Sequence, residues 1–108
     1  MDNNLQEQIK LLKIGYVKKL EGMLPEFKSI SKKTSLLAID ELYSKVHTIS
    51  GTSGMYGLNE LSDFSTNFEL YLKKIKNDSN CYDESIFLNM LVEYIEYIED
   101  ITKGENDG

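Results

Sequence analysis

The sequence predicts an all-α protein, an antiparallel up-down bundle of four helices in a single domain that spans residues 1–108. Three observations favour this fold class. Apolar residues recur at steps of three or four, turn-forming residues divide the chain into four segments, and no segment alternates as a half-buried strand does. The predicted helices cover residues 4–31, 36–53, 58–76 and 83–103.

The first predicted helix begins at Asn4, because Glu7 follows three residues later in a capping-box arrangement. Pro25 normally stops or kinks a helix. Phe27 and Ile30 continue the apolar pattern, so we expect a bent continuation to about residue 31. One face of this helix is predicted to point inward with Leu5, Ile9, Leu12, Tyr16, Leu20 and Met23.

The second predicted helix follows a short polar connection at residues 32–35, in which Ser35 is the expected N-cap. Gly54 and Gly57 end it, because two glycines three apart weaken a helix and permit a turn. Its inward residues are predicted to be Leu36, Ile39, Leu42, Val46 and Ile49.

The third and fourth predicted helices are separated by the turn-forming cluster at residues 77–80. The fourth begins near Asp83 and ends at Lys103-Gly104, after which residues 105–108 are expected to fray. The third buries Leu58, Leu61, Phe64, Phe68, Leu72 and Ile75, and the fourth buries Phe87, Met90, Leu91, Tyr94, Ile98 and Ile101.

Composition restricts the function. The net charge is −6 and all twelve positive charges are lysines, so we expect no nucleic-acid partner and no arginine clamp for phosphate. No apolar stretch approaches the roughly 20 residues of a membrane span, and no secretory signal is visible. We therefore expect a cytoplasmic protein without a membrane partner, most simply a monomer. Cys81 lies in a polar stretch and is interpreted as an inert thiol.

The only histidine, His47, has neighbours that indicate an exposed imidazole. A histidine in the core is ringed by large apolar side chains, whereas small residues surround this one. Gly51 within a helix costs about 1 kcal/mol relative to alanine, so something other than helix stability favours it. Close approach by another macromolecule accounts for the pattern. The residues one or two helical turns from His47 are Tyr43, Ser44, Ser50, Gly51 and Gly54.

A single exposed imidazole supports few reactions. A metal site requires further ligands, and the chain has no second histidine and only a distant cysteine. Neither a nucleophile elbow nor a Gly-rich nucleotide loop is present. Covalent phosphate transfer needs only one nucleophilic nitrogen when a partner supplies the metal and the electrostatic catalysis.

The segment HTISGTSG at residues 47–54, followed by Gly57-Leu58, resembles the phosphorylation motif of histidine-phosphotransfer (HPt) domains. The likeness is closest to the N-terminal phosphotransfer domain of chemotaxis-type histidine kinases, in which His-Thr-Leu-Lys-Gly-Ser-Ser-Gly is typical. It extends weakly to Leu24-Pro25 and Phe68-Glu69. The resemblance implies a helical bundle that exchanges a phosphoryl group with a sensor histidine kinase and a response-regulator receiver domain.

Carried over by position, the resemblance implies that His47 is the phosphoacceptor and that Glu69 orients its imidazole. Ser50 and Gly51 would lie next to the phosphate. The chain would have no cofactor and no metal of its own, because the divalent metal is expected in the receiver, and it would not be an enzyme by itself. The expected partner-binding residues are Tyr43, Ser44, Gly54, Met55 and Tyr56.

Ser50 departs from the family, which usually has a lysine at this position. A serine donates one hydrogen bond to a phosphoryl oxygen and brings no charge. Lys45 and Lys74 are candidates for a compensating charge. The departure keeps an alternative open: an HPt-like adaptor that is not phosphorylated and docks receiver or kinase domains. Glu69 also has an alternative interpretation, as an ordinary solvent-exposed carboxylate.

Overall fold

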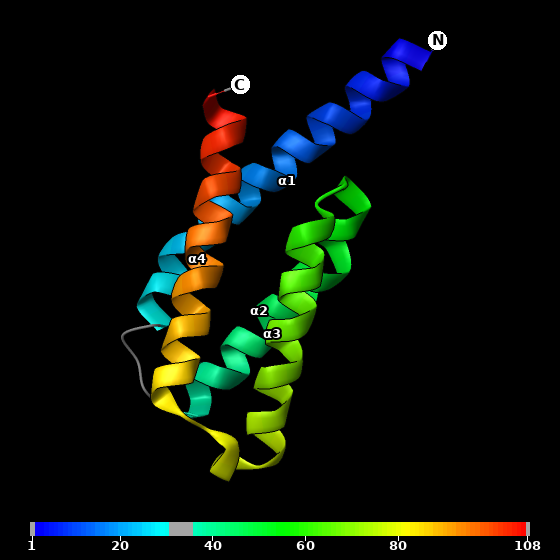
Figure 1. The fold of residues 1–108 in the computed structure, drawn as a ribbon. Helices are drawn as coiled ribbons and strands as arrows, with labels where there is room; N and C mark the ends of the chain where they lie inside the picture. The colour runs from blue at the N-terminus through cyan, green and yellow to red at the C-terminus, as the bar shows by residue number, and fades with distance from the viewer. Residues whose placement is uncertain (1, 31–35, 108) are drawn as a thin grey trace.

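The computed structural model describes residues 2–30 and 36–107, and over these ranges it is helical with no strand. The helices are α1 (Asp2–Ile30), α2 (Leu36–Ser53), α3 (Asn59–Asn77) and α4 (Glu84–Asp107) (Figure 1). Two short 3-10 helices, η1 (Gly54–Tyr56) and η2 (Ser79–Cys81), connect α2 to α3 and α3 to α4. The predicted all-α class and the four helices are confirmed.

The four helices share one apolar core. Helix α2 packs mainly against α3, and α1 packs mainly against α4 (Figure 1). The predicted periodicity of α2, α3 and α4 is largely confirmed, because the residues expected to point inward are buried or half-buried where their side chains are described. The buried apolar side chains of α1 and α2 are Val17, Leu20, Leu24, Phe27, Ile30, Ala38, Ile39, Leu42, Val46 and Ile49.

Tyr94 lies at the centre of this core and connects three helices. Its ring packs edge-on against Phe27 of α1 and Phe68 of α3, with ring centroids 5.8 and 5.3 Å away. Its hydroxyl forms a 2.6 Å hydrogen bond with the Ser65 hydroxyl, which satisfies both buried groups. Burial raises the pKa of Tyr94 because the charged phenolate is poorly solvated there.

The turn predicted at the two glycines is present. Gly57 adopts a left-handed backbone with φ of 77°, which glycine tolerates without a steric penalty. The Gly57 N–H donates to the Gly54 carbonyl at 3.2 Å, and the Leu58 N–H donates to the Ser53 carbonyl at 3.0 Å. These bonds satisfy the Ser53 carbonyl at the end of α2 and the Gly54 carbonyl in η1, where the chain turns toward α3.

Several predicted helix ends need correction. Helix α1 begins at Asp2, so Asn4 lies inside the helix and is not its N-cap. Helix α4 continues through Gly104 to Asp107, so the predicted stop and the predicted fraying are wrong as far as residue 107. Gly104 does not adopt the left-handed backbone with which a C-terminal glycine commonly ends a helix. The expected Ser35 cap and the connection at residues 32–35 lie outside the described residues.

The other helix boundaries agree with the predictions more closely. Helix α1 passes through Pro25 and ends at Ile30. Helix α3 begins at Asn59, one residue after the predicted start. Helix α4 begins just after Asp83, whose side chain accepts a 3.2 Å hydrogen bond from the Ile86 N–H and caps the helix.

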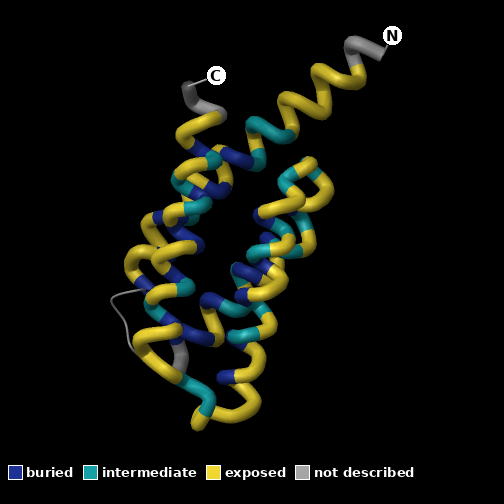
Figure 2. Tube along the Cα trace, in the orientation of Figure 1, coloured by how far each residue is buried: buried dark blue, intermediate teal, exposed yellow. Residues whose placement is uncertain are grey.

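The predicted inward face of α1 is wrong at its N-terminal end. Leu5, Ile9 and Leu12, named here the N-terminal stripe, are 60 %, 52 % and 61 % exposed. Helix α1 is the longest helix, and its first turns project past the other helices, so no neighbour covers them (Figure 1). Burial begins at Val17, and the preceding described side chains are exposed or half-buried (Figure 2).

Candidate functional site

His47 projects from α2 with 66 % of its side chain exposed, and its Nδ1 contacts the Oε1 atom of Glu69 on α3. The Glu69 side chain is only 17 % exposed. A carboxylate accepts hydrogen bonds, so Nδ1 of the neutral imidazole donates, and the lone pair of the ring lies on Nε2. Within the described part of the chain, Nε2 has no hydrogen-bond partner. The ring is therefore oriented through one nitrogen and open at the other.

The apolar layer beneath the pair explains its position. His47 follows Val46 on α2, and Glu69 follows Phe68 on α3, and both apolar residues are fully buried. Neighbouring residues on an α-helix are about 100° apart around its axis. Each polar side chain therefore emerges at the edge of its helix where the α2–α3 contact meets solvent.

A series of residue pairs, named here the polar ladder, connects α2 and the first residue of η1 to α3 along this edge. From one pair to the next, the number of residues gained along one side of the ladder equals the number of residues lost along α3. The two sides therefore run in opposite directions and in register. A Cβ atom built on Gly54 would lie 3.6 Å from the Ser62 hydroxyl, which places these two residues at the top of the series. The pairs below them are Ser50–Thr66 at 2.7 Å between hydroxyl oxygens, His47–Glu69, and Asp40–Lys76 at 3.2 Å.

The hydroxyl hydrogen of Ser50 is already used in a hydrogen bond within the ladder. Thr66 donates its own hydroxyl hydrogen to the Ser62 carbonyl at 2.9 Å, so it accepts from Ser50. The Ser62 hydroxyl in turn donates to the Ser50 carbonyl at 3.0 Å. In this arrangement Ser50 has no hydrogen to donate to a phosphoryl oxygen.

Tyr43 and Ser44 lie one turn before His47 on α2. The Tyr43 ring is nearly parallel to the His47 ring, with centroids 6.0 Å apart, and Lys76 Nζ lies 4.3 Å from the Tyr43 centroid. The Tyr43 ring therefore lies between the side chains of His47 and Lys76 and packs against both of them. Ser44 is exposed, and its carbonyl accepts a 3.1 Å hydrogen bond from the Thr48 hydroxyl.

The surface beyond His47 is open. Gly51 is exposed, and a Cβ atom built on it would meet no atom within 4 Å apart from its chain neighbours and the backbone of its own helix. The fold therefore has space for a larger residue at this position. Met55 in η1 is 78 % exposed. Tyr56 instead stacks on Tyr16 of α1, with ring centroids 4.6 Å apart, so the expected partner-binding residues Met55 and Tyr56 are not equally accessible.

Lysines near the site are arranged differently from the sequence prediction. Lys45 forms a 2.6 Å ion pair with Glu26 of α1. The register of the ladder assigns Lys73, and not its neighbour Lys74, to the position opposite Tyr43. Lys73 is exposed and lies one helical turn beyond Glu69. Sequence analysis did not consider Lys73, although its spacing of four residues from Glu69 places it on the same side of α3.

Within residues 5–30 and 38–104, whose side chains are described, no three His, Cys, Asp or Glu side chains form a group suited to a metal ion. None of the described helices combines the length and the apolar character needed to cross a membrane. Comparison with protein-family models, with curated proteins and with solved structures finds no match to this chain.

Proposed function

We propose that this protein is a cytoplasmic histidine phosphocarrier of phosphorelay signalling, a transfer intermediate and not an enzyme by itself. In this proposal His47 accepts a phosphoryl group from a sensor histidine kinase or a phosphorylated receiver and exchanges it with an aspartate of a response-regulator receiver domain. The observation that carries the proposal is the hydrogen bond between Nδ1 of the exposed His47 ring and the half-buried Glu69 carboxylate. The divalent metal for the reaction belongs to the receiver.

The proposed transfer uses Nε2 as the nucleophile. Its lone pair forms the N–P bond while the P–O bond of the aspartyl phosphate breaks, and the aspartate leaves as a carboxylate. The proton on Nδ1 stays on the ring, hydrogen-bonded to Glu69, which stabilises the positive charge that develops on the imidazole. Transfer to a second receiver is the reverse of these bond changes.

The proposal includes an up-down antiparallel arrangement of all four helices and an open face for the receiver. Support for the first comes from the matched steps of the polar ladder and from the short η1 and η2 connections. Support for the second comes from the open space around Gly51. Lys73 would supply the positive charge next to the phosphate that the family takes from the position of Ser50.

The test is phosphorylation with isotope-labelled ATP and the sensor kinases of the same cell. We expect acid-labile, alkali-stable phosphate on wild-type protein and none on His47→Gln. Equal labelling of His47→Gln would show that the proposal is wrong. Circular dichroism of the variant checks that the helices remain.

A second candidate is an HPt-like adaptor without phosphate, and the commitment of the Ser50 hydrogen to Thr66 favours it. The adaptor would bind a receiver equally well after His47→Ala. Binding that survives this substitution, in a protein that no kinase or phosphorylated receiver labels, would identify the adaptor.

A further inference from the structure

The aromatic ring of Tyr43 packs along one side of the His47 imidazole. The two rings are nearly parallel, with an angle of 13° between their planes and centroids 6.0 Å apart, which is within the range of an offset stack. Side chains on an α-helix lean toward its N-terminus, so His47 leans toward Tyr43, one turn earlier, and away from Gly51, one turn later. Gly51 has no side chain that could cover the imidazole. The aromatic support of His47 therefore comes from the side of Tyr43.

Tyr43 is itself held from several directions. It is half-buried and packs against the apolar core. The Nζ atom of Lys76 on α3 lies 4.3 Å from the centroid of the Tyr43 ring, which is a cation–π distance, and 3.2 Å from Oδ1 of Asp40. In the described part of the chain the Tyr43 hydroxyl has no hydrogen-bond partner, so the ring makes these contacts. The ring is therefore a fixed surface beside His47.

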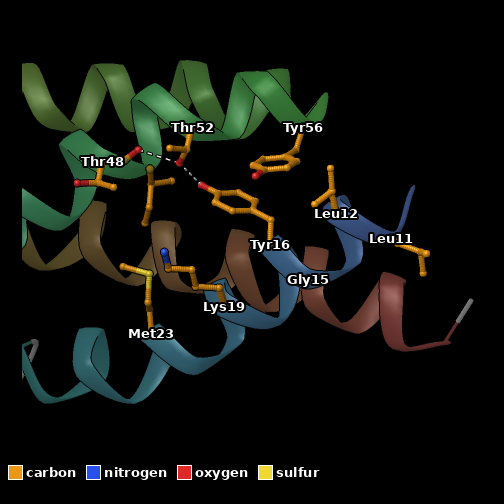
Figure 3. Close-up of a pocket in the computed structure, with 10 residues that line it drawn as sticks. Leu11, Leu12, Gly15, Tyr16, Lys19, Met23, Thr48, Thr52 and Tyr56 are labelled. Carbon is orange, nitrogen blue, oxygen red and sulfur yellow. Dashed lines mark hydrogen bonds between the residues drawn. The ribbon is translucent and has the colours of Figure 1, made fainter. Parts of the chain in front are cut away.

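A second stacked pair lies in a groove of about 400 Å³ between α1 and α2 (Figure 3). Tyr16 of α1 stacks on Tyr56 of η1 with ring centroids 4.6 Å apart, and its hydroxyl lies 2.7 Å from the Thr52 hydroxyl. Thr52 donates to the Thr48 carbonyl at 2.9 Å, and both threonines line the groove. Both rings of this pair are half-buried and join two helical elements, whereas the first pair lies within α2 and presents its imidazole to solvent.

A single hydrogen bond does not fix the plane of an imidazole. The last side-chain torsion of histidine has a broad energy profile, so the ring can tilt while Nδ1 keeps its bond to Glu69. The lone pair of Nε2 lies in the plane of the ring, and tilting the ring therefore changes the direction of the lone pair. A parallel aromatic ring opposes this motion, because tilting would separate the two faces. Reaction rates depend strongly on such alignment of the reacting atoms.

We propose that Tyr43 is a positioning residue, which fixes the plane of the His47 imidazole and so directs the Nε2 lone pair toward the phosphoryl group of a docked receiver. This inference rests on the proposed phosphocarrier function. Tyr43 takes no part in the bond changes of the transfer. The proposal gives Tyr43 a role within the protein in place of the expected contact with a partner.

The first test needs no phosphate. Carbon relaxation NMR gives the order parameter of the Cε1–Hε1 bond of His47, the only histidine in the chain. We expect about 0.85 in wild type and in Tyr43→Phe, and a fall below about 0.6 in Tyr43→Leu. If Tyr43→Leu does not fold, Tyr43→Met replaces it, because the flexible methionine side chain fills the space without an aromatic face. Equal order parameters in wild type and the folded variant would overturn the proposal.

The second test separates positioning from partner binding, using a phosphorylated receiver and rapid-quench kinetics. We expect kcat to fall about tenfold in Tyr43→Leu with KM unchanged, and Tyr43→Phe to transfer like wild type. Tyr16→Leu is the matched control, because it also removes a half-buried, stacked tyrosine beside α2, and it should transfer at the wild-type rate.

The kinetic outcomes distinguish this proposal from the phosphocarrier function. A raised KM with unchanged kcat in Tyr43→Leu would make Tyr43 a partner contact and would overturn the positioning role alone. Failure of the wild-type protein to exchange phosphate with any receiver or kinase would refute the phosphocarrier function and this role together.

Discussion

The polar ladder and the N-terminal stripe are both exposed, for opposite reasons. The ladder pairs its polar groups within the chain, as His47 with Glu69 and Ser50 with Thr66, so its face is organised before any partner binds. The stripe presents the apolar side chains of Leu5 and Ile9 directly to solvent. The comparison teaches that exposure alone does not identify a functional surface. The chemistry and pairing of the exposed groups must be considered with it.

The largest expected effect concerns the apolar layer beneath the ladder. Leu72 is fully buried, so Leu72→Ala should lower the free energy of unfolding by about 2–5 kcal/mol through lost burial and a residual cavity. Urea denaturation followed by circular dichroism measures the loss. A change within about 0.5 kcal/mol would mean that this layer does not hold the ladder in place.

The substitution Glu69→Gln removes the negative charge beside His47 and keeps the shape of the side chain. An amide can still accept the hydrogen bond from Nδ1 but brings no negative charge, and we expect the phosphotransfer rate to fall about 10- to 100-fold. Rapid-quench kinetics with a phosphorylated receiver measure the rate, and nitrogen NMR of the imidazole reports the tautomer.

The matched control is Asp63→Asn, which removes an exposed carboxylate elsewhere on α3. It should transfer phosphate at the wild-type rate. Equal rates for Glu69→Gln and wild type would favour the interpretation of Glu69 as an ordinary surface carboxylate.

A smaller effect is expected at Lys73. Because Lys73 is exposed and its charge is screened by solvent, Lys73→Gln should slow transfer only about two- to fivefold. Ser50→Lys in the same background should restore the rate by supplying the charge from α2. Lys74→Gln is the control, since the ladder register excludes it. If Lys73→Gln and Lys74→Gln slow transfer equally, the role assigned to Lys73 is wrong.

The smallest effect is expected in the N-terminal stripe. In dilute protein that sediments as a monomer, Ile9→Ala should change the free energy of unfolding by less than about 0.5 kcal/mol, because Ile9 already faces water. Urea denaturation measures this change in the free energy of unfolding, with Leu72→Ala measured in parallel for comparison. A loss comparable with that of Leu72→Ala would show that the stripe is covered by its own chain.

The sequence predicted much of the fold because the apolar period and the two glycines are strong local signals. Helix α2 has the predicted bounds, and the turn at Gly57 uses the left-handed backbone that glycine permits. The exposure of the N-terminal stripe could not be predicted in this way. Periodicity identifies the apolar side of a helix, whereas burial depends on whether another element extends far enough to cover it.

The site was only partly predictable. Helical spacing placed small residues around His47, and the contact with Glu69 was expected from the family resemblance alone. The roles of both residues stay predictions. The position of Tyr56 against Tyr16 depends on how η1 turns the chain, which no local pattern specifies. Likewise, the commitment of the Ser50 hydrogen depends on Thr66, sixteen residues away on another helix.

The two surfaces of α2 predict the pattern of phenotypes in a mutational scan. His47 and Thr48 are adjacent in sequence, yet one meets Glu69 of α3 and the other lines the groove beside α1. Neighbouring positions on this helix thus belong to separate surfaces. A scan of single substitutions along α2 should therefore yield alleles that alternate between two phenotypes, with a period set by the helical turn.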